Sequence, residues 1–197
     1  GLASALIAAP FMASTAFAGG HGTLKYVLVS HAPDSDSWWN TVKNGIALAG
    51  DQMGVEVEYR NPPTGDLADM ARIIEQAAAS GPNGIITTLA DYDVLSGAIS
   101  AAVDSGIDVI IMNSGTPAQA REVGALMYVG QPEYDAGHAA GMRAKGDGVA
   151  SFLCVNHYIS SPSSTERCQG FADGLNFYLA THPDVAPKLL TRFEPWM

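Results

Sequence analysis

LKYVLVSHAPDSDSWWN, residues 24–40, decides the fold by joining a short apolar run to a helical pattern through a polar loop. The run LKYVLVS (24–30) is continuous and of strand length, which is typical of a buried strand. After the loop, apolar residues recur at helical spacing and predict one inward helix face: Val42, Ile46, Ala49 and Met53. The stretch therefore predicts a strand followed by a helix.

The same alternation recurs with a period of about thirty residues. Four further apolar runs predict strands: VEVEY (55–59), GIITTL (84–89), IDVIIMN (107–113) and LMYVG (126–130). One intervening helix is capped by Asp66 and has the inward residues Leu67, Met70, Ile74 and Ala77, and the next carries Leu95, Ala98, Ala102 and Val103. Because parallel neighbours need a crossover helix, the pattern predicts an open α/β fold with a doubly wound parallel sheet.

Ligands of open α/β sheets bind at the carboxyl ends of the strands. The candidate loops are therefore those that follow Ser30, Leu89, Asn113 and Gly130. The first of these loops ends in two adjacent tryptophans.

A second unit is predicted after the turn Gly146-Asp147-Gly148. We expect an N-terminal α/β lobe over 22–146, closed by a helix from Pro132 to about Lys145. VASFLCV (149–155) predicts a strand, and a helix from about Thr165 follows it. Residues 147–197 are too few for a second doubly wound sheet, so we interpret them as the start of a truncated C-terminal lobe and the sequence as a fragment.

The amino end has a different composition. Residues 2–18 are apolar and uncharged, and Ala16-Phe17-Ala18 matches the small-x-small pattern that signal peptidase recognises. We interpret residues 1–18 as a signal peptide, incomplete at its start, and expect an exported protein of the periplasm. A membrane anchor is the alternative, but the run is short and Pro10 interrupts it.

Charge and motif content exclude several functions. The net charge of −10 and the absence of any Lys/Arg run disfavour nucleic acids and anionic membranes as partners. The first loop lacks the glycines of dinucleotide and P-loop sites, and no G-x-S-x-G motif is present. We therefore expect no enzyme activity, no cofactor and no metal.

The two cysteines, Cys154 and Cys168, leave two interpretations open. They could pair in an oxidising compartment, or they could be buried free thiols. A zinc site is disfavoured because His157 is the nearest third ligand and no fourth falls at a recognisable spacing.

Several side chains suit a small polar ligand. An aromatic face contacts the apolar face of a sugar or polyol, and carboxylates, amides and guanidinium groups bind its hydroxyls. The residues of these types are Asp36, Trp38, Asn113 and Arg167. Each of these residues also has a purely structural interpretation. Trp38 or Trp39 could pack beneath the helix, and Asp34 or Asp36 could cap it. Asn113 could be a turn residue, and Arg167 could form a surface ion pair with Glu166 or another neighbour. We expect one tryptophan in the cleft and the other in the packing.

A family resemblance covers Leu24 to about Leu175. The matching features, in order, are YVLVS, an aromatic pair followed by VKNG (42–45), GVEVEY, GIITT, GIDVIIMNSG, YVGQPEYDAGHAAG and ERCQGF (166–171). In this order the sequence resembles the type I sugar-binding periplasmic proteins of ABC importers, the ribose/galactose-binding family. CVNH and RCQGF resemble a branch of that family that includes binders of sugars and sugar alcohols.

The resemblance implies two doubly wound lobes joined by three crossing strands, which close on a sugar or polyol and deliver it to an ABC permease. We expect a monomer. A sensor, or the effector domain of a LacI-type repressor, is the alternative with the same fold. It is disfavoured because the amino end carries a signal-like segment instead of a DNA-binding helix-turn-helix.

By position, the family's ligand residues fall on Ser30, Asp36, Trp38, Trp39, Asn113 and, in the second lobe, Arg167. His31, Asp91 and His157 lie in the matching loops and are further candidates. Ribose binders have Asp-Arg in place of Asn113-Ser114 and phenylalanines in place of the tryptophans, so the particular sugar is not implied. The remaining second-lobe contacts and two crossing strands are expected beyond Met197.

Overall fold

The computed structural model describes residues 23–149, 151–155 and 160–181. Its five strands form one parallel sheet in the order β2-β1-β3-β4-β5. They are β1 (Lys25–Val29), β2 (Glu56–Arg60), β3 (Gly84–Thr87), β4 (Asp108–Met112) and β5 (Met127–Val129). Each predicted strand of the first lobe is confirmed. The strand order reverses at β1, and such a reversal leaves a crevice at the carboxyl edge of the sheet.

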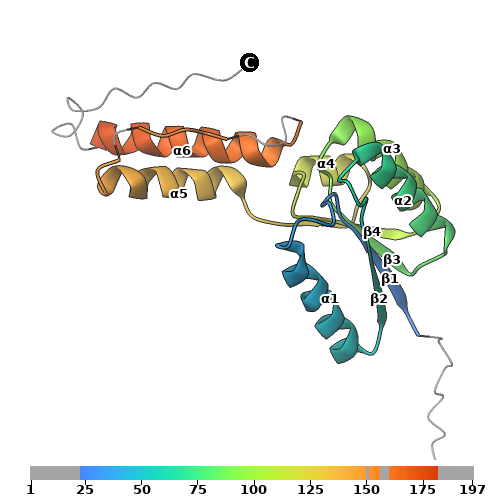
Figure 1. Ribbon diagram of the computed structural model, residues 1–197. Coiled ribbons are helices and arrows are strands. Elements are labelled where there is room, and N and C mark those ends of the chain that lie inside the picture. Colours follow the sequence, from blue (N-terminus) through green and yellow to red (C-terminus); the bar gives the residue numbers. More distant parts are fainter. Residues whose placement is uncertain (1–22, 150, 156–159, 182–197) are drawn as a thin grey trace, which may run out of the picture.

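Helices cover the two faces of the sheet unequally (Figure 1). One face carries α1 (Trp39–Met53), and the other carries α2 (Leu67–Ala79), α3 (Tyr92–Asp104) and the short α4 (Pro117–Glu122). The larger core cluster includes Met70, Ile74, Leu95 and Ile99 of α2 and α3, packed with Ile85 and Ile111 of the strands. A smaller cluster beneath α1 centres on Leu28, Ala32 and Trp39.

The inward face of α1 differs from the predicted one. Val42 and Ile46 pack against the smaller cluster, but Ala49 is exposed and Met53 is 75% exposed. The helix approaches β2 through Gly50 instead, where an added Cβ would lie 3.0 Å from the carbonyl oxygen of Val55. Glycine at this position lets the helix lie close to the strand, and the pattern of apolar residues alone does not reveal such a contact.

The two predicted helices that contribute to the larger core cluster, α2 and α3, are confirmed. The Asp66 carboxylate accepts a hydrogen bond of 2.7 Å from the Asp69 amide and caps α2. Met70, Ile74 and Ala77 of that helix are buried. The six-residue α4, capped by Thr116, was not predicted, because an element of that length has no periodicity to detect.

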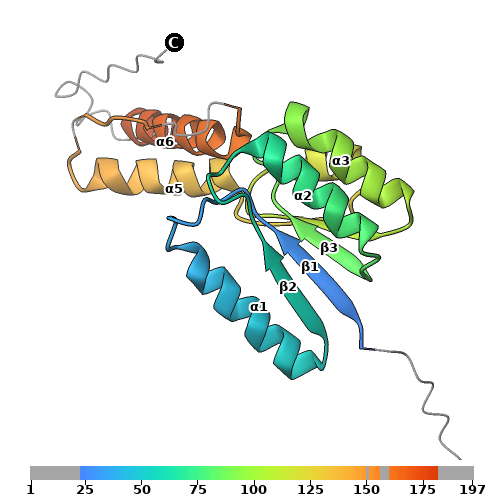
Figure 2. The same ribbon diagram turned by 45° about the vertical axis from the view of Figure 1, so that its right-hand side comes forward.

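Helices α5 (Glu133–Gly146) and α6 (Pro162–Thr181) lie side by side, away from α1 to α4 (Figures 1 and 2). They meet through four glycines, Gly137 and Gly141 on α5 and Gly170 and Gly174 on α6. A Cβ at any of these positions would collide with a backbone carbonyl of the opposite helix. The two helices are therefore in direct backbone contact. The expected boundary after Gly146 stays a prediction.

The second unit also departs from prediction. The expected strand VASFLCV forms no ladder over residues 151–155, because no described strand lies beside them. Helix α6 begins at Pro162, earlier than the expected Thr165. The predicted signal peptide, His157 and the last residues, from 182, lie outside the described residues. Among the described helices, none has the length and apolar character needed to span a membrane.

Candidate functional site

Because the strands are parallel, their carboxyl ends meet at one edge of the sheet, where all the predicted loops lie. Ser30, at the end of β1, is fully buried there. Its hydroxyl lies 2.6 Å from the hydroxyl of Tyr59 at the end of β2. Burial raises the pKa of Tyr59, and the hydrogen bond with Ser30 acts in the opposite direction. Ser30 thus joins the ends of β1 and β2, and its contact with a ligand stays a prediction.

His31 is also buried and links the loops after β1 and β3. Its backbone N–H donates to the Thr88 hydroxyl at 3.1 Å, and its Nδ1 lies 2.9 Å from the same oxygen. The imidazole packs edge-on against Trp39 with ring centroids 5.5 Å apart. These contacts support the loop geometry.

The two tryptophans divide between the core and the surface. Trp39 is 3% exposed and packs with Leu28 and Ala32, whereas Trp38 is 56% exposed. Their rings meet edge-on, with centroids 5.3 Å apart. The expectation that one of the two tryptophans packs in the core is confirmed for Trp39. The contact of Trp38 with a ligand stays a prediction.

The two aspartates of the first loop have different roles at the start of α1. The cap position is Trp38, with no side-chain cap hydrogen bond. Asp36 accepts the Trp38 N–H at 3.1 Å, which shapes the turn before the helix. Asp34 accepts from the Asn61 side-chain amide at 2.9 Å and connects this loop with the one after β2. The helix-cap alternative therefore holds for Asp36, whose carboxylate accepts an N–H in the turn that leads into α1, and not for Asp34.

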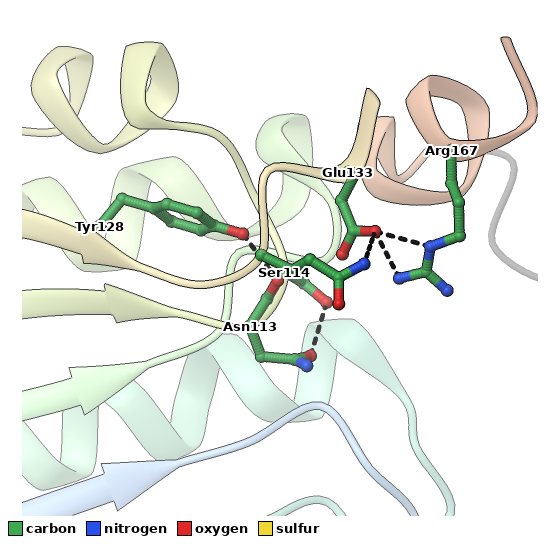
Figure 3. A network of polar contacts seen from close by, with 6 residues as sticks. Asn113, Ser114, Tyr128, Glu133 and Arg167 are labelled. Atoms are coloured by element: carbon green, nitrogen blue, oxygen red, sulfur yellow. Dashed lines mark hydrogen bonds and ion pairs between the residues drawn. The ribbon is translucent and has the colours of Figure 1, made fainter. Parts of the chain in front are cut away.

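Asn113, directly after β4, has the left-handed φ of 61°, which few residues other than glycine adopt. Three hydrogen bonds hold it there. Its N–H donates to Val129 at 3.0 Å, its carbonyl accepts from the Tyr128 hydroxyl at 2.9 Å, and its Oδ1 accepts from the Ser114 hydroxyl at 3.1 Å. Figure 3 shows Tyr128 and Ser114 on either side of it. Backbone strain held in this way is typical of functional sites.

Tyr128→Phe should lower the free energy of unfolding by about 1 kcal/mol, because the carbonyl of Asn113 then loses a donor in a half-buried setting. Burial, followed by the charge of Glu133, raises the pKa of Tyr128. The phenol therefore remains a donor, and the difference should persist up to about pH 10 and disappear above it. Urea denaturation at several pH values measures this. Tyr26→Phe is the control, and equal losses in the two variants would contradict the role.

Asp91 caps α3, since its carboxylate accepts the Val94 N–H at 3.1 Å. Asp91 thus has a structural role as a helix cap at the carboxyl edge of the sheet, and its contact with a ligand stays a prediction. His157 is outside the described residues.

Arg167 pairs with Glu133 and not with Glu166. Its Nε and Nη2 lie 2.6 and 2.5 Å from a single oxygen of Glu133, Oε2. The side-chain amide of Gln131 donates to the same oxygen at 3.2 Å. Glu133 is only 7% exposed, whereas the Arg167 side chain is 56% exposed. Figure 3 shows this pair beside Asn113, where α5 and α6 begin.

Glu133 was missed by the sequence analysis. An acidic residue in the first turn of a helix is common, because it interacts favourably with the helix dipole. Its partner lies 34 residues away in the chain. No local pattern in the sequence links the two residues.

Cys154 and Cys168 form a disulfide, with their Cα atoms 5.9 Å apart. The bond joins residues 151–155 to the helix that carries Arg167. Of the two open interpretations of the cysteines, the paired one therefore holds.

A hollow of about 460 Å³ lies between α5, α6 and residues 152–155. Its lining is mostly apolar and includes Phe152, Leu153, Val155 and Phe171. Of the predicted ligand residues in the described part of the chain, only Arg167 lines it. The hollow therefore meets the strand ends only at Arg167 and at Gln131, in the loop after β5.

The edge gathers polar and aromatic groups suited to non-covalent binding: Trp38, Asp36 and Asn113 on the sheet, and Arg167 on α6. Within residues 23–149, 151–155 and 160–181, no group of three or more metal-ligating side chains occurs. An open α/β sheet with such an edge defines a class of protein that binds small molecules.

Residues 26–188 match the family model described as "Periplasmic binding protein domain". The chain belongs to this family of periplasmic binding proteins, and its fold is the one that the strand pattern and the resemblance predicted.

Solved structures of sugar-binding proteins are similar to the chain. A carbohydrate transporter from Acidothermus cellulolyticus, in complex with myo-inositol, is 34% identical, with a TM-score of 0.72 over 78% of this chain and 52% of that one. A sugar-binding protein of a Bacillus halodurans sugar ABC transporter is 26% identical, with a TM-score of 0.69 over 85% and 54%. GanP, a glucose-galactose binding protein from Geobacillus stearothermophilus, is 23% identical, with a TM-score of 0.70 over 87% and 57%. The chain thus spans little more than half the length of each.

Proposed function

We propose that the chain belongs to an exported solute-binding protein that captures a sugar or sugar alcohol between two lobes and delivers it to an ABC permease. The observation that carries the proposal is the placement of an exposed tryptophan, a strained asparagine and an arginine where the strands of a periplasmic-binding-protein sheet end. The similarity to a carbohydrate transporter in complex with myo-inositol supports a cyclic polyol or sugar as ligand.

Each accessible group has a distinct role in this proposal. The Trp38 indole stacks on the apolar face of the ligand, and Asn113 and Arg167 bind its hydroxyls. Asp36 uses one carboxylate oxygen for the Trp38 N–H and offers the other to the ligand. The buried residues Ser30, His31 and Trp39 hold the loops in place, and Asp91 caps α3.

A thermal-shift screen of the full-length protein, expressed from its gene, tests the proposal. The panel is myo-inositol, D-glucose, D-galactose, D-xylose and D-arabinose. A bound ligand at a hundredfold excess over its dissociation constant stabilises the native state by about 2.7 kcal/mol. Trp38→Ala and Asn113→Ala should weaken binding far more than they lower stability. A folded protein that shifts with none of these compounds would contradict the proposal.

A further inference from the structure

The charged residues of the loops at the carboxyl edge of the sheet are all acidic. The loops after the strands, residues 30–38, 61–66, 88–91, 113–116 and 130–133, contain no Lys or Arg. They contain Asp34, Asp36, Asp66, Asp91 and Glu133. Arg60, the last residue of β2, is paired with Glu58 at 2.8 Å. Lys43 of α1 has its Nζ 4.6 Å from the centre of the Tyr59 ring, beside these loops. Arg167 is therefore the cation that α6 brings to a set of loops that contains only acidic charges.

Glu133 neutralises that cation from a buried position. One carboxylate oxygen accepts from both Nε and Nη2 of Arg167 and also from the Gln131 amide. A guanidinium group has five N–H donors, so the pair with Glu133 leaves donors free. The side chain that carries these donors is 56% exposed. The arginine can still bind hydroxyls, although its charge is already matched.

The backbone of Arg167 is held as well. Its carbonyl lies against Gly137, one turn after Glu133, at a distance that leaves no room for a side chain. Cys168, the next residue, is joined by its disulfide to Cys154. Arg167 is thus held at both its backbone and its side chain, and it meets a ligand only through the donors that the pair leaves free.

We propose that Glu133 is a positioning residue that aims Arg167 at the ligand and restricts the site to neutral sugars and polyols, against sugar acids and sugar phosphates. The inference rests on the proposed function. An anionic ligand at the free donors would lie near a buried carboxylate that already balances the charge of the guanidinium, and it would also face the surrounding aspartates. A neutral ligand needs only hydrogen-bond donors.

Isothermal titration of the full-length protein with matched pairs of compounds tests the inference. The pairs are myo-inositol and myo-inositol 1-phosphate, D-glucose and D-glucuronate, D-galactose and D-galacturonate, and D-arabinose and D-arabinonate. For the wild type, the neutral member of the best-bound pair should bind at least about tenfold more tightly, the scale of one charge-assisted hydrogen bond. A wild type that prefers the anionic member would overturn the inference, whatever the variants do.

Glu133→Gln keeps the shape of the side chain and its contact with Gln131 but releases the charge of Arg167. The ratio of the two dissociation constants should move by about tenfold or more toward the anionic member. Glu133→Asp retains the charge and should keep the neutral preference even if overall affinity falls. A purely structural role would weaken both members equally and leave the ratio unchanged.

Glu166→Gln is the matched control, because it changes the net charge by the same amount on the neighbouring residue of α6. It should leave the ratio unchanged. An equal shift in Glu166→Gln and Glu133→Gln would overturn the role of the pair. A wild type that binds neither member of any pair would overturn the proposed function itself. Failure of the proposed function thus abolishes binding, whereas failure of the inference about Glu133 leaves binding and changes only the preference.

Discussion

Trp39→Ala is expected to lower the free energy of unfolding by about 3–5 kcal/mol, the range for removing a large aromatic side chain from a core. Trp39 is 3% exposed and is the largest member of the small cluster between α1 and β1. It also contacts the rings of His31 and Tyr59, with centroids 5.5 and 6.5 Å away. Its loss should therefore loosen the loop after β1 as well as α1. Urea denaturation of the full-length protein, followed by circular dichroism, measures the change.

Trp38→Ala is the matched comparison, because it removes the same side chain one residue earlier. This side chain is 56% exposed, so the loss of stability should be below about 1 kcal/mol. Equal losses in the two variants would mean that Trp38 is also a packing residue, and its proposed contact with a ligand would lose its basis.

Loss of the disulfide should have the second largest effect on stability. Cys154 and Cys168 are 14 positions apart, and a loop of about this length gives about 3 kcal/mol in the chain-entropy account. The double variant Cys154→Ser, Cys168→Ser should therefore unfold at a lower urea concentration than the oxidised wild type. The wild type treated with dithiothreitol should match the variant.

The same comparison contains its own control. The double variant has no disulfide to reduce, so dithiothreitol should not change its unfolding curve. If the oxidised wild type and the double variant unfold alike, the bond contributes nothing to stability, and α6 is held by its contacts with α5, which include the glycine contacts and the Arg167–Glu133 pair.

The fold of the first unit could be predicted because its signals are local. Five apolar runs of strand length alternate with helical patterns, and both were found where they were expected. The inward face of α1 was predicted less well, since Ala49 and Met53 are exposed. Its approach to β2 depends on the absence of a side chain at Gly50, which hydrophobic periodicity does not register.

The candidate site could be predicted as a set of loops, but the role of each residue in them could not. Ser30, His31 and Asp34 are held by partners at the ends of β2 and β3, 27 to 57 positions away in the sequence. Glu133 lies 34 positions before Arg167. Whether such residues face a ligand or one another depends on how the loops pack, and no pattern along a single loop determines that.

The strand expected over 149–155 illustrates a different limit. Its apolar composition is that of a buried strand, yet Leu153 and Val155 are each 72% exposed. A strand is defined by hydrogen bonds to a neighbour, and no neighbour lies beside it in the described part of the chain. Composition can indicate the tendency of a segment to form a strand, but it cannot supply the second strand.

The glycine contact between α5 and α6 has a consequence for how ligand preference can change over evolution. Side-chain interfaces accommodate substitutions by repacking, but at Gly137, Gly141, Gly170 and Gly174 the facing atoms belong to the backbone. Arg167 therefore cannot be shifted gradually by mutations between the two helices. Under the proposed function, a lineage that acquires a new sugar would change the residues at the strand ends, such as Trp38 and Asn113, while these four glycines stay the same. A directed-evolution library should follow the same rule and leave these positions unvaried.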